Sequence, residues 1–268
     1  MKTLVVANRK GGVGKSAIAT MLSHYLVQDE RRVLAIDLST CGDFGRALRR
    51  SGRTSLAPFR ASAMFESDMP ASPAGGFALV QSNWGLADME QRPDRHRDYV
   101  RGLRRFLDSV ATDFDACVID THSMPDIAHA AALACAHVVL VPAQLHADGM
   151  AGLSRVLDDD HAGVRLLGAS ADSPLEQVRI LPNLVESTGY ERANFQRLVQ
   201  QYGSLLLPHP SDARKYATLP RRSMVSEAQF EGRVLWEMKN AGARDAARLI
   251  KAVIGTVAAL ITSREVRP

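Results

Sequence analysis

Short apolar runs alternate along the chain with longer segments in which apolar residues recur at helical spacing. This alternation predicts βα units and therefore an α/β fold built on a mostly parallel sheet. The strands are expected at about 3–7, 33–37, 77–82, 115–119, 137–141, 177–181 and 204–207. The helices are expected at about 15–28, 95–111, 126–135, 149–161 and 191–202.

Several of the expected strands, such as 33–36 and 138–141, are apolar at every position. Continuous apolar strands are typical of a doubly wound sheet that helices cover on both faces. At 268 residues the chain fits a single domain. Residues 51–76 are rich in Ser, Ala, Pro and Gly, which predicts a surface excursion with little regular structure. Residues 226–262 form a final helical region, packed on the domain, with an expected break near 240–242.

The composition is that of a soluble globular protein, with 46% hydrophobic and 23% charged residues. No apolar run approaches the ~20 residues that span a bilayer, and the chain enters a strand almost at once, so we expect no signal peptide. Cys41, Cys117 and Cys135 are widely spaced without a C-x-x-C pair, which favours a reducing cytoplasm over a disulfide framework or zinc ribbon. The net charge of +4 suggests a polyanionic partner.

The stretch KGGVGKSA, residues 10–17, lies between the first strand and the first helix. Its Gly-Lys-Ser ending completes the phosphate-loop pattern, in which Lys15 reaches the β- and γ-phosphates and Ser16 binds Mg²⁺. The pattern departs at its first glycine, where Arg9 stands, so a glycine-rich turn without a ligand is the alternative. The residues predicted to contact ATP here are Lys10, Gly11, Gly12, Val13, Gly14, Lys15, Ser16 and Ala17.

Two further strands end in an aspartate, Asp37 and Asp120, where a doubly wound sheet places its ligand groups. Four apolar residues followed by Asp is the Walker B form, whose carboxylate holds Mg²⁺. The predicted metal site therefore consists of Ser16, Asp37 and Asp120. The alternative for either aspartate is a cap on a turn or helix.

The stretch KGGVGKS resembles the deviant Walker A loop of the ParA/MinD group of P-loop ATPases, which have the SIMIBI type of fold. In that group the early lysine reaches across a nucleotide-sandwich dimer to the partner's phosphates. The resemblance implies that Lys10 is this trans-acting cation while Lys15 serves its own subunit, so both are catalytic candidates. Asp37 lies 22 residues beyond Lys15, as in ParA-type proteins.

Both switch segments depart from the family pattern. ParA-type proteins usually read D-x-D-P-Q-G-N, whereas residues 37–43 read DLSTCGD, with Ser39 at the second aspartate. Residues 121–125, THSMP, replace the usual Pro-rich segment. Because serine cannot orient the attacking water with a full charge, ATP binding is better supported than turnover, and we expect a weak ATPase. Asp43 and Asp126 are the candidates to compensate.

The resemblance also extends into the second half of the chain. It implies that Asn183 contacts the adenine, with a loop-capping Asn as the alternative, and that Pro208 lies beside the base. It also implies non-specific DNA binding through C-terminal basic residues by counterion release. The residues predicted to bind DNA are Arg214, Lys215, Arg221 and Arg222, each with a solvated helix face as the alternative.

The resemblance implies an ATP-dependent DNA partition switch in the cytoplasm, with ATP and Mg²⁺ as cofactors. The ATP-bound homodimer would bind non-specific DNA on the nucleoid, and a ParB-like partner would stimulate hydrolysis and release. One alternative is a MinD-like membrane-positioning ATPase. We expect no stable membrane association, however, because the face of the last helix is mostly Ala, Val and Ile. Two others are an iron–sulfur carrier, disfavoured without C-x-x-C, and a switch with little or no hydrolysis.

Overall fold

Seven parallel strands form the central sheet, in the order β3-β4-β2-β5-β1-β6-β7. The computed structural model describes residues 1–159, 163–170, 172–238 and 243–262. The strands are β1 (Lys2–Val6), β2 (Val33–Asp37), β3 (Ser55–Arg60), β4 (Phe77–Gln81), β5 (Ala116–Asp120), β6 (Val138–Ala143) and β7 (Gln177–Pro182).

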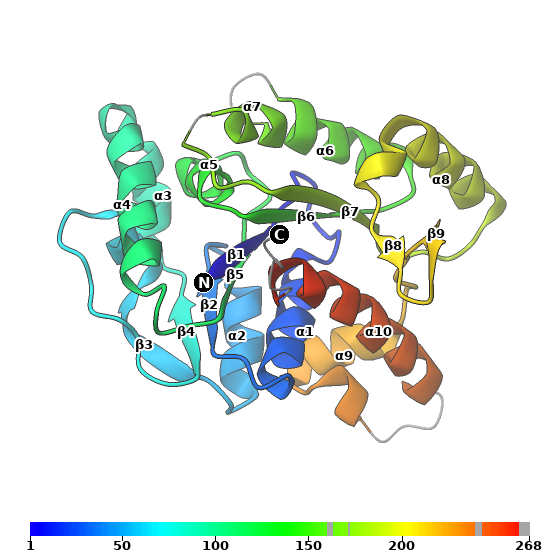
Figure 1. Cartoon of the computed structure of the whole chain (residues 1–268), viewed down its shortest axis with the longest axis horizontal. Coiled ribbons are helices and arrows are strands. Elements are labelled where there is room, and N and C mark those ends of the chain that lie inside the picture. Colours follow the sequence, from blue (N-terminus) through cyan, green and yellow to red (C-terminus); the bar gives the residue numbers. More distant parts are fainter. Residues whose placement is uncertain (160–162, 171, 239–242, 263–268) are drawn as a thin grey trace, which may run out of the picture.

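Helices cover both faces of the sheet, so that Figure 1 shows three layers. One layer consists of α1 (Lys15–Gln28), α2 (Asp43–Arg50), α9 (Ser223–Glu231) and α10 (Ala243–Thr262). The other layer consists of α3 (Gly85–Glu90), α4 (His96–Ser109), α5 (Ile127–Ala134), α6 (Ala147–Asp158), α7 (Val164–Gly168) and α8 (Gly189–Tyr202). The predicted doubly wound α/β fold is therefore confirmed.

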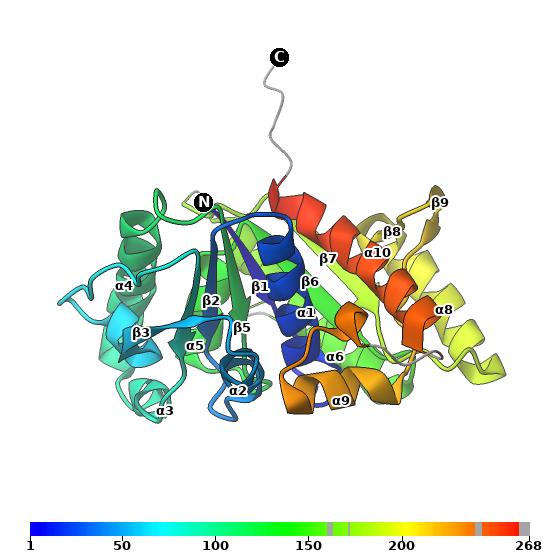
Figure 2. The ribbon, with the colours of Figure 1, turned by 90° about the horizontal axis from the view of Figure 1, so that it is seen from below.

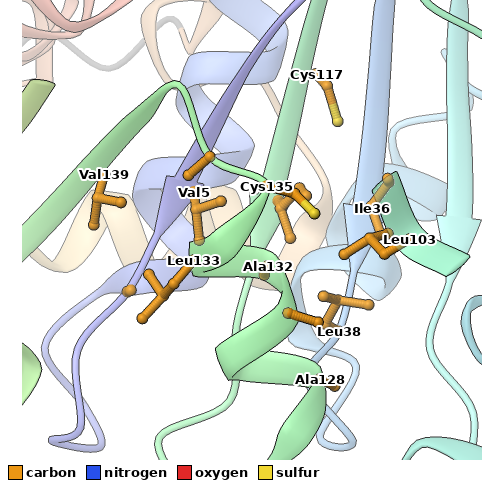
Figure 3. Close-up of a cluster of buried hydrophobic side chains, with 14 of the residues drawn as sticks. Val5, Ile36, Leu38, Leu103, Cys117, Ala128, Ala132, Leu133, Cys135 and Val139 are labelled. Carbon is orange, nitrogen blue, oxygen red and sulfur yellow. The ribbon is translucent and has the colours of Figure 1, made fainter. Parts of the chain in front are cut away.

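The core consists of two hydrophobic clusters, one on each face of the sheet. Figure 3 shows part of the first, where Val5 and Ile36 of the sheet lie against Ala132 of α5 and Leu103 of α4. All four side chains are fully buried. Because helices pack on both faces, successive residues of the inner strands are buried alike, which explains their continuous apolar runs.

Residues 51–76 contain more regular structure than predicted. Residues 55–60 form β3, one of the two edge strands of the sheet, and residues 61–65 form a 3₁₀ helix. The strand includes Pro58 and leaves several side chains exposed, as an edge strand permits because one side of its backbone needs no ladder partner. The composition rich in Ser and Pro, which predicted a loop, is here that of an exposed edge strand.

The prediction of a strand at 204–207 is wrong. Residues 203–205 form a 3₁₀ turn, and only Leu206 makes an isolated parallel bridge, to Ile180 of β7. Pro208 has no N–H with which to continue this pairing. The chain turns instead into an antiparallel hairpin of β8 (Pro208–His209) and β9 (Asp212–Tyr216), which the sequence did not indicate.

Helices α2, α3 and α7 were not predicted, and the C-terminal helical region begins earlier than expected, with α9 at Ser223. The predicted break at 240–242 and the predicted helix end at 161 lie outside the described residues. In α10, Ile250, Val253 and Val257 are buried, as expected of a helix packed on the domain, whereas Leu249 is 40% exposed. Within the described part of the chain, no helix is long and apolar enough to cross a membrane.

Candidate nucleotide site

The carboxyl ends of β1, β2 and β5 meet at one edge of the sheet, at a cavity of about 640 Å³. Strand β5 lies between the other two, with Asp120 paired in register to Asp37 on one side and Val6 on the other. The cavity is lined from the glycine-rich loop by Gly11, Gly12, Gly14, Lys15, Ser16 and Ala17. Of the remaining predicted loop contacts, Val13 is fully buried, and Lys10 does not line the cavity.

The loop conformation requires its glycines. Gly12 and Gly14 have φ of 74° and 90°, the left-handed region that side chains disfavour. A Cβ on Gly14 would also overlap the amide of Asn183. Helix α1 begins directly after this residue, at Lys15, so its N-terminal backbone N–H groups face the cavity. The loop and helix together form a concave surface suited to an anion.

The ammonium group of Lys15 lies over this loop. Its Nζ donates to the hydroxyl of Ser123 at 3.1 Å and to the carbonyl of Lys10 at 3.3 Å. Burial lowers the pKa of Lys15, while the neighbouring Asp120 acts in the opposite direction. A buried cation that donates to two neutral acceptors fits a site built for phosphate.

Lys10 points to a different place, the exposed side of α6. Its Nζ lies 3.4 Å from the Asp148 carboxylate, and its Cβ lies close to Gly152. Its backbone N–H donates to Asn8, whose amide donates in turn to the Pro142 carbonyl at 2.7 Å. Sequence reasoning missed Asn8, although a polar residue directly after a buried strand was a usable signal.

Ser16 and Asp120 form the part of the site that fits a metal ion. The Ser16 hydroxyl donates to Asp120 Oδ2 at 2.6 Å, while Asp120 Oδ1 is buried without a hydrogen-bond partner among the described residues. Burial and the nearby Asp37 raise the pKa of Asp120 to about 8. A divalent cation would satisfy the free oxygen and neutralise the buried charge. Mg²⁺ takes such sites, with one carboxylate and the remaining positions left for phosphate and water.

Asp37 has both carboxylate oxygens occupied. They accept the backbone N–H groups of Ser39 at 2.9 Å and Gly45 at 2.7 Å, which holds the loop between β2 and α2. Burial raises the pKa of Asp37 to about 6, although these two hydrogen bonds act in the opposite direction. Its contacts fit the loop-capping alternative better than a direct metal ligand.

Comparison with known proteins gives the family. Residues 1–161 match the family model described as AAA domain. Over 265 residues the chain is 30% identical to Protein IncC of Escherichia coli, covering 94% of this chain and 68% of IncC. It is 26% identical over 268 residues to the chromosome partitioning protein ParA of Caulobacter vibrioides, covering 95% and 94% of the two chains. The chain belongs to the ParA/Soj/IncC family of partition ATPases.

Solved structures share the fold of this ParA-family chain. A variant of Cyanothece McdA in complex with ATP superimposes with a TM-score of 0.74 at 19% identity, covering 95% of this chain and 96% of McdA. Cobyrinic acid a,c-diamide synthase of Mycobacterium smegmatis, solved with ADP and magnesium, gives a TM-score of 0.67 at 23% identity, covering 88% and 93%. These structural homologues hold ATP or ADP, the latter with Mg²⁺.

Ser39 and the two candidates to compensate for it, Asp43 and Asp126, do not all line the ParA-type cavity. Ser39 and Asp43 line it, and Ser39 is buried. Asp43 forms an ion pair with Arg46. Asp126 does not line the cavity; its side chain accepts the backbone N–H of His129 and caps α5. Asp43 is therefore the nearer of the two candidates to compensate for serine at position 39.

Asn183 also lines the cavity, but its amide nitrogen donates to the Val13 carbonyl at 2.7 Å. It thus supports the phosphate loop. Pro208 lies in β8 and does not line the cavity, whereas Pro220 does. Both prolines follow a leucine, so the sequence alone did not distinguish them. Pro208, the predicted one, belongs to the β8–β9 hairpin and not to the cavity wall.

The four predicted DNA-binding residues do not form one surface. Arg214 and Lys215 lie on β9 and both pair with Asp212, while Arg221 pairs with Glu186. Arg222 lines the nucleotide cavity, next to α9. Figure 2 shows α9 at the lower edge of the molecule and the β8–β9 hairpin at its upper right.

Sequence reasoning missed the contribution of α2 and α9 to the cavity. Arg46 and Arg50, one helical turn apart on α2, both line it. The Arg50 guanidinium also lies 4.9 Å from the ring centre of Phe230 on α9. The spacing of the two arginines was visible in the sequence, but the approach of α9 to α2 was not.

Proposed function

We propose that the protein is an ATP-dependent partition switch that binds MgATP in this cavity. The observation that carries the proposal is the convergence of Lys15, Ser16 and Asp120 on one glycine loop, with a buried carboxylate oxygen left without a partner in the described part of the chain. Lys15 would hold the β- and γ-phosphates, and Ser16 with Asp120 would hold Mg²⁺. Asp37 would keep the adjoining loop in place.

We propose further that ATP drives a homodimer in which Lys10 serves the partner's nucleotide. Lys10 is partly exposed, and its only ion pair among the described residues is a long one to the exposed Asp148. Exposed pairs of this kind contribute roughly 0–1 kcal/mol, so little holds the side chain in place. The dimer would bind DNA non-specifically on the nucleoid, in the cytoplasm, until a ParB-like partner stimulates hydrolysis.

Ser39 supports a second function, an ATP-bound switch with little or no hydrolysis. It is buried at the cavity wall where an acidic residue would orient water, and its hydroxyl carries no charge. Single-turnover hydrolysis separates the two functions. A gain in rate for Ser39→Asp, with unchanged ATP affinity, would support the binding-only switch. A fast parent enzyme that Ser39→Asp does not improve would contradict it.

DNA binding across a salt series tests the proposed switch. Duplexes of two unrelated sequences are titrated in the presence of ATP with Mg²⁺, ADP with Mg²⁺, or no nucleotide. Binding should require ATP, differ little between sequences and fall steeply with salt, because several phosphates are contacted together. Lys15→Ala is the matched control and should not bind under any condition. Equal binding with ADP and ATP would contradict the proposal.

A further inference from the structure

The positive charge of the protein is concentrated in a segment outside the nucleotide site. Residues 92–105 contain six arginines and two aspartates, a net charge of +4 that equals that of the whole chain. The remainder of the chain is therefore neutral overall. The segment includes most of α4, which lies at one side of the molecule, in the layer opposite α1 and α10 (Figure 1).

The arginines of this segment differ in how they are paired. Arg101 pairs with Asp98 in the preceding turn, and Arg104 donates to the Ala134 carbonyl at the end of α5. Arg97 and Arg105 are exposed, and neither has an ion pair among the described residues. Of these two, Arg97 lines the groove described next, and its unpaired guanidinium group is available there to bind a carboxylate or phosphate.

Beside these arginines lies a groove of about 690 Å³ between α4, α5 and α7. Its floor includes the half-buried hydrophobic side chains Val100, Ala130 and Leu167, which pack against the core. Its cationic wall consists of Arg97, Arg101 and Arg104. These three follow one another at helical spacing over about 10 Å of α4. We call this feature the α4 groove.

We propose that the α4 groove binds an acidic, amphipathic segment of a protein partner. Its carboxylates would pair with the arginine wall, and its apolar side chains would cover the floor. Charge complementarity and the apolar floor both favour a peptide. The phosphates of a DNA duplex could pair with the arginines, but a duplex has no apolar side chains to cover the floor of Val100, Ala130 and Leu167.

The groove also adjoins the switch segment through α5. That helix begins two residues after 121–125, and its first N–H, of Ile127, donates to Glu90 of α3. At its other end, α5 accepts the hydrogen bond from Arg104 of the groove wall. An occupant of the groove would therefore contact α5, the helix that follows β5 and the switch segment 121–125.

The probe is a fluorescent 16-residue helical peptide with Leu along the face that would meet the groove floor and Glu at the other positions. It is compared with an analogue in which every Glu is replaced by Gln. Binding is measured by anisotropy on the full chain. The test variant is Arg97→Glu with Arg101→Glu. The matched control is Arg244→Glu with Arg248→Glu, another exposed i, i+4 pair, whose second arginine likewise pairs with an aspartate three residues earlier. ATP binding by each variant reports its folding.

The test variant should weaken binding of the Glu peptide about tenfold or more, while the control pair changes it less than twofold. The Gln peptide should bind weakly to all three proteins. Equal losses in both double variants, or equal binding of the Glu and Gln peptides, would overturn the proposal. It would also be overturned if the test variant lost DNA binding but kept the Glu peptide, since the groove would then belong to a DNA surface.

Discussion

The buried carboxylates Asp37 and Asp120 should respond in opposite ways to neutralisation in the nucleotide-free protein. Asp37→Asn replaces one acceptor oxygen by an NH₂ group that faces a backbone N–H, of Ser39 or Gly45. A buried donor left without its acceptor costs about 1–3 kcal/mol. Asp37→Asn should lower the free energy of unfolding by up to that amount, because removing the buried charge of Asp37 offsets part of the cost. With a urea m-value of roughly 3 kcal/mol/M, the midpoint falls by up to about 1 M.

Asp120→Asn should leave stability at pH 8.5 equal or higher. It removes a buried negative charge beside Asp37 and keeps an oxygen for the Ser16 hydroxyl. The new amide finds no acceptor among the described residues, which offsets part of this gain. Binding of MgATP should be lost all the same, because the metal would lose its carboxylate.

The pH dependence follows from the raised pKa of Asp120, about 8 in the folded protein against ~3.9 in the unfolded chain. In that interval the folded state holds a proton that the unfolded state has released, so stability falls as pH rises, by up to ~1.4 kcal/mol per pH unit. Buried His24 and His129 have pKa values lowered to about 4 and lose stability only as pH falls below ~6.5. From pH 6.5 to 8.5 the titration of Asp120 therefore lowers stability, while the lowered pKa of Lys15 acts in the opposite direction. The difference between the parent and Asp120→Asn gives the contribution of Asp120.

Urea unfolding with EDTA at pH 6.5, 7.5 and 8.5 measures these effects for the parent and both variants. The parent should become less stable with pH, and Asp120→Asn should show little change. A parent whose stability is flat across the window would refute the reasoning. So would an Asp120→Asn protein that keeps the parent's slope, or an Asp37→Asn protein as stable as the parent.

Three further predictions concern the loop and the proposed DNA contacts. Lys15→Ala should abolish MgATP binding in titration calorimetry, because the phosphates lose their counterion; affinity within about twofold of the parent would count against the phosphate-loop interpretation. Gly14→Ala should destabilise the protein by about 1 kcal/mol or more in thermal unfolding, because the new side chain is strained at φ 90° and clashes with Asn183. Gly52→Ala is the control: this residue also has positive φ but open space around it, so the variant measures the backbone strain without a clash. Charge reversal at Arg214 and Lys215 should weaken ATP-dependent DNA binding equally across sequences and reduce the salt slope by about 2, and an unchanged slope would remove the hairpin from the DNA surface.

The fold was predictable where burial is complete. The strand at 33–37 is buried on both faces, so all of its residues are apolar except the last, Asp37. The strand at 55–60 was not predictable from the same signal, because at the edge its composition follows solvent exposure and includes Pro58. Pro208 shows the same limit, since a single missing N–H ended a strand that the apolar pattern predicted.

The candidate site was predictable where its residues are contiguous or follow a strand. Lys15 and Ser16 belong to one motif, and Asp120 ends a buried strand beside them. The division of roles between Asp37 and Asp120 depends on which backbone N–H groups reach each carboxylate, which no local pattern contains. Where Arg50 of α2 lines the cavity it also contacts Phe230 of α9, and these two residues lie 180 positions apart in the chain.

The most direct test of the central claim is the molar mass of the parent and of Lys10→Ala with MgATP. Light scattering coupled to size-exclusion chromatography should show an ATP-dependent dimer for the parent. Lys10→Ala should bind ATP yet stay monomeric, because removing one cation from each phosphate site weakens dimerisation about a hundredfold or more. Asp148→Ala is the matched control: it removes the partner of Lys10 in α6 and should still dimerise. A parent that stays monomeric with MgATP, or a Lys10→Ala protein that dimerises as the parent does, would contradict the account.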